Sequence, residues 1–239
     1  MSSETQFAAS HSGFWNALLP MAESYIRKHN AQLSSFAHPL ISLVPADQRG
    51  VVNESAFLIF TEMAERGIPS SALSQEVLES CFEKSLQFIA RMRQFSRIPP
   101  EPISDLGRID AMFLADRLAS YFSEQRPAYF RIRPLFPGCG WINSAEGDAL
   151  SDRNLFEVKA GERLFRVIDL RQLLCYCALD FSAKLYQVET ITLVNPRFGT
   201  FIQEDLDTLC QKIAGASAPD VLGEIVNYIS EPFSRYSGV

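Results

Sequence analysis

The chain has 239 residues, of which 47% are hydrophobic and 21% charged, a composition that excludes extensive disorder. It contains no apolar run long enough to span a bilayer, and residues 1–12 lack the basic start and apolar core of a secretory leader, so we expect a cytoplasmic protein with no membrane partner. The net charge is −6, but residues 126–200 hold 10 basic and 8 acidic side chains, so the overall acidity does not exclude nucleic acid as a partner.

The first hundred residues predict helices. One begins at Phe14 and is interrupted or bent by Pro20, a second covers about 53–67, and a third covers about 74–95. These helices suit either a surface that binds a protein partner or a second copy of the chain, or a small helical core that covers the neighbouring domain. Their apolar residues include Phe14, Trp15, Phe57, Leu58 and Phe60.

The third of these helices ends in a cluster of arginines, Arg91, Arg93 and Arg97. Cations in the last turn suit the negative end of the helix dipole, and phosphate binding is the alternative interpretation. Prolines follow directly at positions 99, 100 and 102, which excludes a helix and predicts a stiff, extended connector. We therefore predict a helical N-terminal region over residues 1–100 and a second domain over residues 101–239.

Beyond this connector, helices and strands alternate. A helix is expected first, then three strands, a helix, two further strands and two closing helices. This order predicts an α/β fold in which helices flank a small mixed sheet. The expected ranges are about 105–122, 129–135, 146–150, 155–160, 170–184, 190–194 and 200–202, with the closing helices beginning near 205 and 219.

A turn sequence, Ser-Asp-Arg-Asn at 151–154, separates the second and third of these strands. If Leu150 and Leu155 pair across it, Asp148 lies opposite Glu157 on one face of the hairpin. Two facing carboxylates repel each other unless a cation lies between them. The register therefore predicts a metal site with Asp148 and Glu157 as ligands, and oxygen donors of this kind favour Mg²⁺ or Mn²⁺.

Neighbouring residues would complete such a site. The backbone carbonyl of Val158 is a further expected metal ligand, and Glu146 is an additional candidate. Lys159 is expected on the same face, opposite Glu146, where it would orient or deprotonate the attacking water or stabilise charge that develops on a phosphate. The alternative is a solvated hairpin face with one ion pair between Glu146 and Lys159 and no catalytic role.

Asp148 followed by Glu157-Val158-Lys159 resembles the metal site of the PD-(D/E)xK nuclease superfamily, in which an acid on one strand precedes acid-x-lysine on the next. Gln172 and Tyr176 are similar to the Gln-x-x-x-Tyr signature of the RecB-like branch, whose helix faces the active site. The spacing of four places both side chains on one side of a helix. Structural alternatives are a capping box that uses Gln172 and a core position for Tyr176.

The resemblance covers about residues 105–203 and implies a restriction-endonuclease-like core. It also implies Mg²⁺-dependent hydrolysis of phosphodiester bonds, with DNA as the expected substrate and phage defence or DNA repair as the expected role. Asp148, Glu157, Lys159, Gln172 and Tyr176 would be the catalytic residues. Many members carry another acid on the helix before the sheet, and here the candidates for it are Asp105, Asp110 and Asp116.

Five arginines near the proposed site are candidates for binding the phosphate backbone of a nucleic acid. Isolated surface arginines are the alternative interpretation for each of them. The runner-up function is a catalytically silent nuclease-fold subunit that binds nucleic acid or a protein partner within a larger complex. The five are Arg131, Arg133, Arg163, Arg166 and Arg171.

Overall fold

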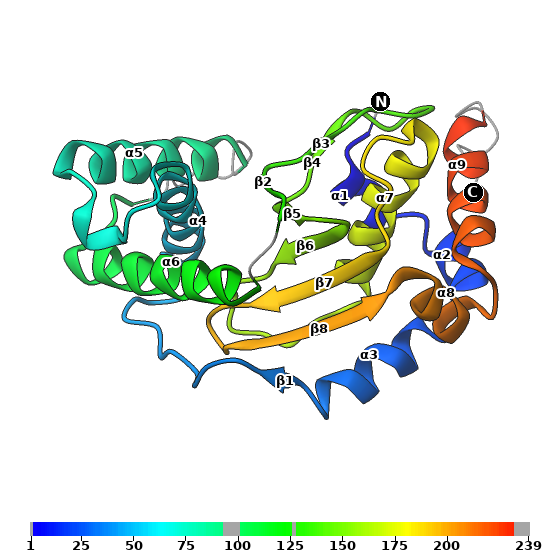
Figure 1. Ribbon diagram of the computed structural model, residues 1–239, viewed down its shortest axis with the longest axis horizontal. Helices are drawn as coiled ribbons and strands as arrows, with labels where there is room; N and C mark the ends of the chain where they lie inside the picture. Colours follow the sequence, from blue (N-terminus) through cyan, green and yellow to red (C-terminus); the bar gives the residue numbers. More distant parts are fainter. Residues whose placement is uncertain (1, 93–100, 126–127, 232–239) are drawn as a thin grey trace.

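The computed structural model describes residues 2–92, 101–125 and 128–231, and it is mixed α/β (Figure 1). Helices α4 to α6 gather at one side of a twisted sheet, and α7 to α9 lie at the other. The helices are α1 Glu4–Ala9, α2 Ser12–Leu18, α3 Ala22–Asn30, α4 Arg49–Arg66, η1 Ser70–Ala72, α5 Gln75–Met92, α6 Asp105–Gln125, α7 Val167–Ala183, α8 Leu206–Ala214 and α9 Ala218–Ser230. The strands are β1 Ser34–Ser35, β2 Phe130–Ile132, β3 Leu135–Phe136, β4 Ala145–Glu146, β5 Ala149–Ser151, β6 Asn154–Val158, β7 Thr190–Asn195 and β8 Thr200–Asp205.

Six strands form one mixed sheet in the order β1-β8-β7-β6-β5-β2. Strands β2, β5 and β6 are antiparallel neighbours, and β7 is parallel to β6 because helix α7 carries the chain back between them. Strands β3 and β4 pair separately, and the strand expected over 129–135 is divided where Arg133 adopts a positive φ of 51°. The predicted α/β class with a small mixed sheet is confirmed.

Each face of the sheet has its own hydrophobic core. Because side chains alternate along a strand, Leu155 packs against α7, whereas its neighbour Phe156 packs on the side of α4 and α6. Helices α1 to α3 complete the first core together with α7 to α9, and α4 to α6 complete the second. Both cores therefore contain residues from either side of the boundary predicted near residue 100. Burying one such leucine or phenylalanine contributes about 1.5–3 kcal/mol.

The predicted N-terminal helices are present. Helix α2 ends at Leu18, before Pro20, and α4 ends at Gly67, which has a left-handed φ of 66°. Trp15, Phe57 and Phe60 are buried in the two cores, so these apolar side chains cover the sheet instead of forming an exposed surface for a partner.

Part of the predicted connector lies outside the described residues. Arg93, Arg97, Pro99 and Pro100 are among the residues that the structure does not describe. Within the described ranges, no helix is both long enough and apolar enough to cross a membrane.

Candidate active site

The hairpin of β5 and β6 has the predicted register. Leu150 pairs with Leu155 across the turn. Asp148 directly precedes β5, and its Oδ2 accepts a hydrogen bond of 2.6 Å from the backbone N–H of Val158, at the end of β6. Glu157 precedes Val158 and points to the same face of the sheet as Leu155, toward α7. The turn thus brings two carboxylates to one end of the hairpin.

The carboxylate of Glu157 is almost completely buried, with 3% of the residue exposed. Its Oε1 accepts a hydrogen bond of 2.6 Å from Nζ of Lys159, whereas its buried Oε2 has no hydrogen-bond partner within the described residues. Burial and the charge of Asp148 raise the pKa of Glu157 to about 8. A buried carboxylate oxygen without a partner is costly, and a cation beside it would remove that cost.

Lys159 is held by side chains from two elements. Besides Glu157 on β6, its Nζ bonds Oε1 of Gln172 on α7 at 2.8 Å and lies 3.9 Å from Oδ1 of Asp169. The predicted cross-strand pair of Lys159 with Glu146 is wrong. Glu146 belongs to β4, where it pairs with Leu135 of β3, and its side chain is exposed.

Glu146 lies outside the main sheet because the chain joins that sheet only after Gly147. The backbone N–H of Gly147 donates to the carbonyl oxygen of Pro134, and a Cβ at this position would meet Phe136 at 3.1 Å and Leu155 at 3.2 Å. The close approach accounts for a glycine here. Glu146 consequently stays near the site but at its rim, 3.7 Å from Arg133.

Gln172 and Tyr176 lie on one side of α7, where Gln172 reaches Lys159. The side-chain nitrogen of Gln172 donates to the hydroxyl of Tyr176 at 3.0 Å, so the two residues and Lys159 form one chain of hydrogen bonds. The predicted capping role of Gln172 is wrong, because the carboxylate that caps α7 is that of Asp169, which accepts from the backbone N–H of Arg166 at 2.8 Å.

Tyr176 is also a core residue. It is 2% exposed, and its ring stacks on Phe136 with 5.4 Å between the ring centroids. Its hydroxyl donates to Oε1 of Glu4 on α1 at 3.4 Å. Tyr176 therefore combines the two interpretations that its sequence position left open, because a buried ring carries a hydroxyl that reaches the polar network.

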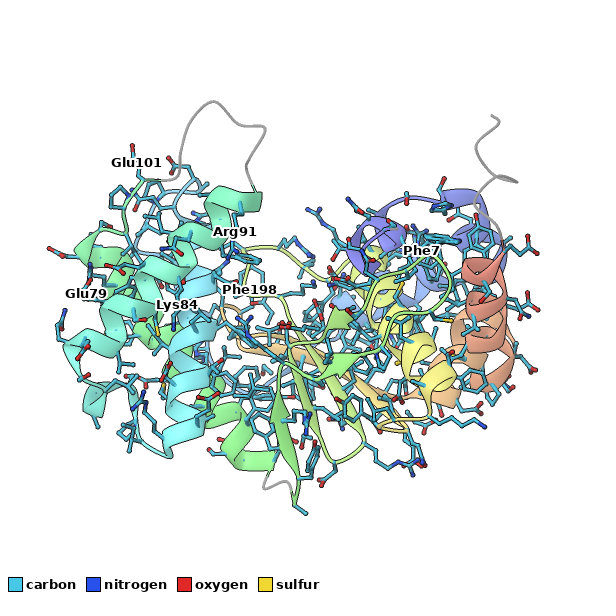
Figure 2. All side chains as sticks on the ribbon, turned by 90° about the horizontal axis from the view of Figure 1, so that it is seen from above. Phe7, Glu79, Lys84, Arg91, Glu101 and Phe198 are labelled. Atoms are coloured by element: carbon cyan, nitrogen blue, oxygen red, sulfur yellow. The ribbon has the colours of Figure 1, made fainter. Side chains whose placement is uncertain are left out.

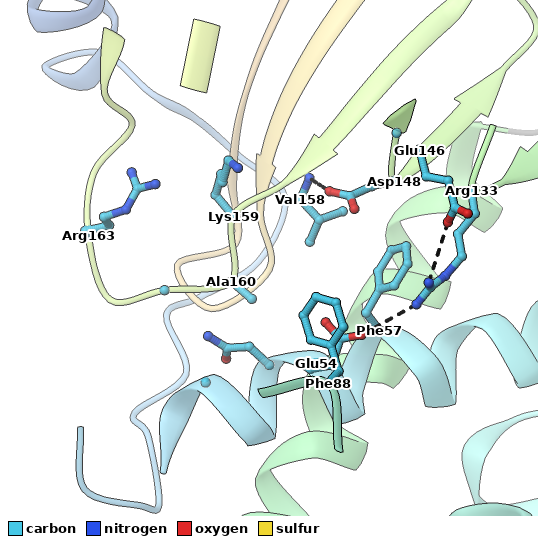
Figure 3. Close-up of a pocket in the computed structure, with 14 residues that line it drawn as sticks. Glu54, Phe57, Phe88, Arg133, Glu146, Asp148, Val158, Lys159, Ala160 and Arg163 are labelled. Carbon is cyan, nitrogen blue, oxygen red and sulfur yellow. Dashed lines mark hydrogen bonds and ion pairs between the residues drawn. The ribbon is translucent and has the colours of Figure 1, made fainter. Parts of the chain in front are cut away.

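A cleft of about 420 Å³ opens beside these residues (Figure 3). Asp148, Lys159 and Val158 line one wall, and residues of α4 and α5 line the other. Glu54 on α4 is the acid on that second wall, and burial and the charge of Asp148 raise its pKa against the opposing effect of Arg133, which lies 3.5 Å away.

The sequence does not predict a role for Glu54, because its helix is far from Asp148 along the chain and carries no motif. The acids that were expected to supply this group have other places. Asp110 is buried and bonds Arg197 at 3.0 Å, and Asp116 accepts a hydrogen bond from Ser70 at 2.9 Å. Asp105 lies in the first turn of α6 and does not line the cleft.

The five predicted arginines do not form one surface. Arg133 and Arg163 line the cleft, but Arg163 forms two hydrogen bonds of 2.7 Å with the carboxylate of Asp169. Arg166 and Arg171 line a different depression beside α3, which also includes Arg27. Arg131 lies on β2, where it donates to the hydroxyl of Tyr129.

The donor set at the site consists of oxygen atoms. In the part of the chain that the structure describes, no three His, Cys, Asp or Glu side chains are grouped as a metal site, so an ion would bind two carboxylates together with backbone carbonyls and water. The buried Oε2 of Glu157, which lacks a partner among the described residues, fits this arrangement.

Comparisons with known proteins do not identify a relative. No protein-family model matches the chain, and no curated protein or solved structure matches it significantly. The chemistry of the cleft therefore has to be inferred from its own residues.

Proposed function

We propose that this protein is a metal-dependent nuclease of the PD-(D/E)xK type, which hydrolyses phosphodiester bonds in DNA. The observation that carries the proposal is the carboxylate of Glu157, buried beside Asp148, with Lys159 on one oxygen and no partner among the described residues on the other. A second support is the order of the elements around the main sheet. Helix α6 precedes β2, β5 and β6, and α7 and β7 follow, with the separate pair β3 and β4 inserted between β2 and β5.

Asp148, Glu157 and the carbonyl oxygen of Val158 would hold Mg²⁺ or Mn²⁺. Asp148 and Val158 line the cleft, and Glu54 lies on its opposite wall. Hard divalent cations prefer oxygen ligands of this kind. When bound, the ion would polarise a phosphate oxygen and lower the pKa of a coordinated water. Asp148 accepts a hydrogen bond from the backbone of Val158, which fixes the direction of its carboxylate before any ion binds.

The remaining residues act on the phosphate and on each other. In hydrolysis, a water oxygen bonds to phosphorus and gives up a proton while the bond to the leaving oxygen breaks, and a proton from the solvent neutralises that leaving oxygen. Negative charge in the transition state lies on the leaving oxygen and on the other phosphate oxygens. Lys159 lines the cleft and would stabilise that charge. Gln172 positions the ammonium group of Lys159, and Tyr176 positions the amide of Gln172.

A cleavage assay tests the proposal directly. Linear, circular, single-stranded and branched DNA would be incubated with Mg²⁺ or Mn²⁺ and wild-type protein, Asp148→Asn, Glu157→Gln or the control Glu224→Gln, whose side chain is exposed on α9. We expect cleavage by the wild-type protein and the control, and none by the other two variants.

Thermal unfolding separates the rival interpretations. At an ion concentration one hundred times its Kd, binding would stabilise the fold by about 2.7 kcal/mol. Stabilisation by Mn²⁺ without cleavage of any substrate would favour the catalytically silent subunit. If the protein cleaves no substrate and is not stabilised by the ion, the carboxylates have no metal role and the proposal is refuted.

A further inference from the structure

The wall of the cleft opposite Asp148 carries an exposed aromatic ring. Phe88 on α5 lines the cleft and keeps 38% of its surface exposed. Its neighbour on that wall, Phe57 on α4, is nearly buried and lies under the guanidinium of Arg133, 5.5 Å from its ring centroid. Among the described residues, no aromatic ring or guanidinium stacks on Phe88. Figure 3 shows both rings facing the strand end that carries Asp148 and Lys159.

Two cations flank this ring along α5. Lys84 lies four residues before Phe88 and Arg91 three residues after it, so all three occupy one side of the helix. Both cationic side chains are exposed, and neither forms an ion pair within the described ranges. Figure 2 shows both on α5, in the helical part of the molecule. An aromatic ring between two exposed cations is a pattern that suits bases and phosphates of a nucleic acid strand.

We propose that α5 selects single-stranded nucleic acid, with one base stacked on Phe88 and the backbone phosphates beside Lys84 and Arg91. This inference rests on the proposed nuclease function, because it assigns the substrate of the same cleft. A base in a duplex already has stacked neighbours on both faces and cannot cover the ring of Phe88 unless it is extruded. The cleft of about 420 Å³ also has the size of a small-ligand site.

Binding can be measured without cleavage. Fluorescence anisotropy in EDTA would compare a single-stranded oligonucleotide, as DNA and as RNA, with a DNA duplex of the same length. Phe88→Leu removes the aromatic ring and keeps an apolar side chain. The matched control is Phe113→Leu, because Phe113 lies on α6 away from the cleft and is 53% exposed.

We expect Phe88→Leu to weaken the binding of the single strand about 5- to 150-fold, which corresponds to the loss of one base–aromatic stack. Phe113→Leu should bind like the wild-type protein, and Phe88→Tyr should retain the affinity because it keeps a ring. The wild-type protein should bind the single strand, as DNA or as RNA, more tightly than the duplex.

The two cations have a separate readout. For single strands, each neutralised phosphate contributes about 0.7 to the slope of log affinity against log salt concentration. Replacing Lys84 and Arg91 by glutamine should therefore reduce this slope by about 1.4. Lys28→Gln, an exposed substitution on α3, should leave it unchanged.

The outcomes distinguish this inference from the nuclease function. Tighter binding of the duplex, or equal affinities of Phe88→Leu and Phe113→Leu, would overturn the inference and leave the cleavage assay unaffected. Single-strand binding that depends on Phe88, in a protein that cleaves no DNA or RNA, would support α5 as the binding element and refute the nuclease function.

Discussion

The side-chain oxygen of Gln172 accepts a hydrogen bond of 2.8 Å from Nζ of Lys159, and this bond ties helix α7 to the last residue of the acid-x-lysine sequence. Lysine side chains are long and carry many rotamers, so a free lysine at a strand end would be poorly placed for catalysis. The hydrogen bond to Gln172 and the ion pair with Glu157 restrict it to one position. The geometry of the candidate site therefore depends on the packing of α7 as much as on the hairpin.

Lys159→Ala is expected to lower cleavage by at least about a hundredfold, since removing one charge-stabilising group of this kind costs roughly 2.7–4 kcal/mol in the transition state. It should also destabilise the fold by about 1–3 kcal/mol, because Oε1 of the buried Glu157 loses its hydrogen-bond donor. Initial cleavage rates and the free energy of unfolding in urea measure the two effects.

A double variant tests the cause of the loss of stability. Adding Glu157→Gln to Lys159→Ala replaces the buried carboxyl group by a neutral amide, so stability should return toward that of the wild-type protein. Cleavage should be abolished, because Glu157 is a proposed metal ligand. Cleavage by the double variant would exclude both Lys159 as a catalytic group and Glu157 as a metal ligand.

Glu54→Gln is expected to raise the Mn²⁺ concentration needed for half-maximal cleavage about 10- to 100-fold, as loss of a supporting group around a metal site commonly does. The carboxylate faces the same cleft as Asp148, and burial together with the charge of Asp148 raises its pKa. Glu65→Gln, an exposed change on the same helix, is the control. If the metal dependence of the two variants is the same, Glu54 does not belong to the site.

Tyr176→Phe should lower the cleavage rate about tenfold or more, because the amide of Gln172 loses the hydroxyl that orients it and small displacements at a catalytic group are costly. Stability should fall by only about 1 kcal/mol, since the buried ring keeps its stacking on Phe136. Tyr186→Phe is a matched control, because Tyr186 also contacts Phe136 and donates one hydrogen bond, to Leu135. Equal losses of activity in both variants would assign Tyr176 to the core alone.

The stability of the N-terminal segment should depend on pH through His11. Burial lowers the pKa of His11 below its usual 6.5, and its Nδ1 lies 2.9 Å from the hydroxyl of Tyr228 on α9. The folded state therefore binds a proton less readily than the unfolded state. The stability associated with a neutral His11 is present above about pH 6.5 and is lost as the pH falls through the lowered pKa.

Melting temperatures between pH 7.5 and 5.0 test this prediction. His11→Asn removes the titrating group and suits the left-handed backbone at this position, where φ is 54°. The loss of Tm on acidification should be smaller in His11→Asn than in the wild-type protein or in His38→Asn, a change at an exposed histidine. Identical pH profiles in all three proteins would exclude the titration of His11 as a cause.

The hairpin and the helix that follows it were predictable because their signals are local. A turn sequence sets the pairing of Leu150 with Leu155, and strand alternation then decides which face carries Glu157. The spacing of four between Gln172 and Tyr176 needs only helical geometry to place both on one side. The proposed nuclease function depends on the same local signals and stays a prediction.

Only the tertiary structure decided which side chains lie across the cleft from Asp148 and Lys159. Glu54 and Phe88 reach the cleft because α4 and α5 pack with α6 over one face of the sheet, and Arg49 of α4 pairs with Glu162 in the loop after β6. Contacts between segments about a hundred residues apart leave no periodic signal in the chain, because they depend on how whole layers pack. Gly147 is a short-range example, because the space beside Phe136 and Leu155 that leaves little room for a Cβ exists only in the folded molecule.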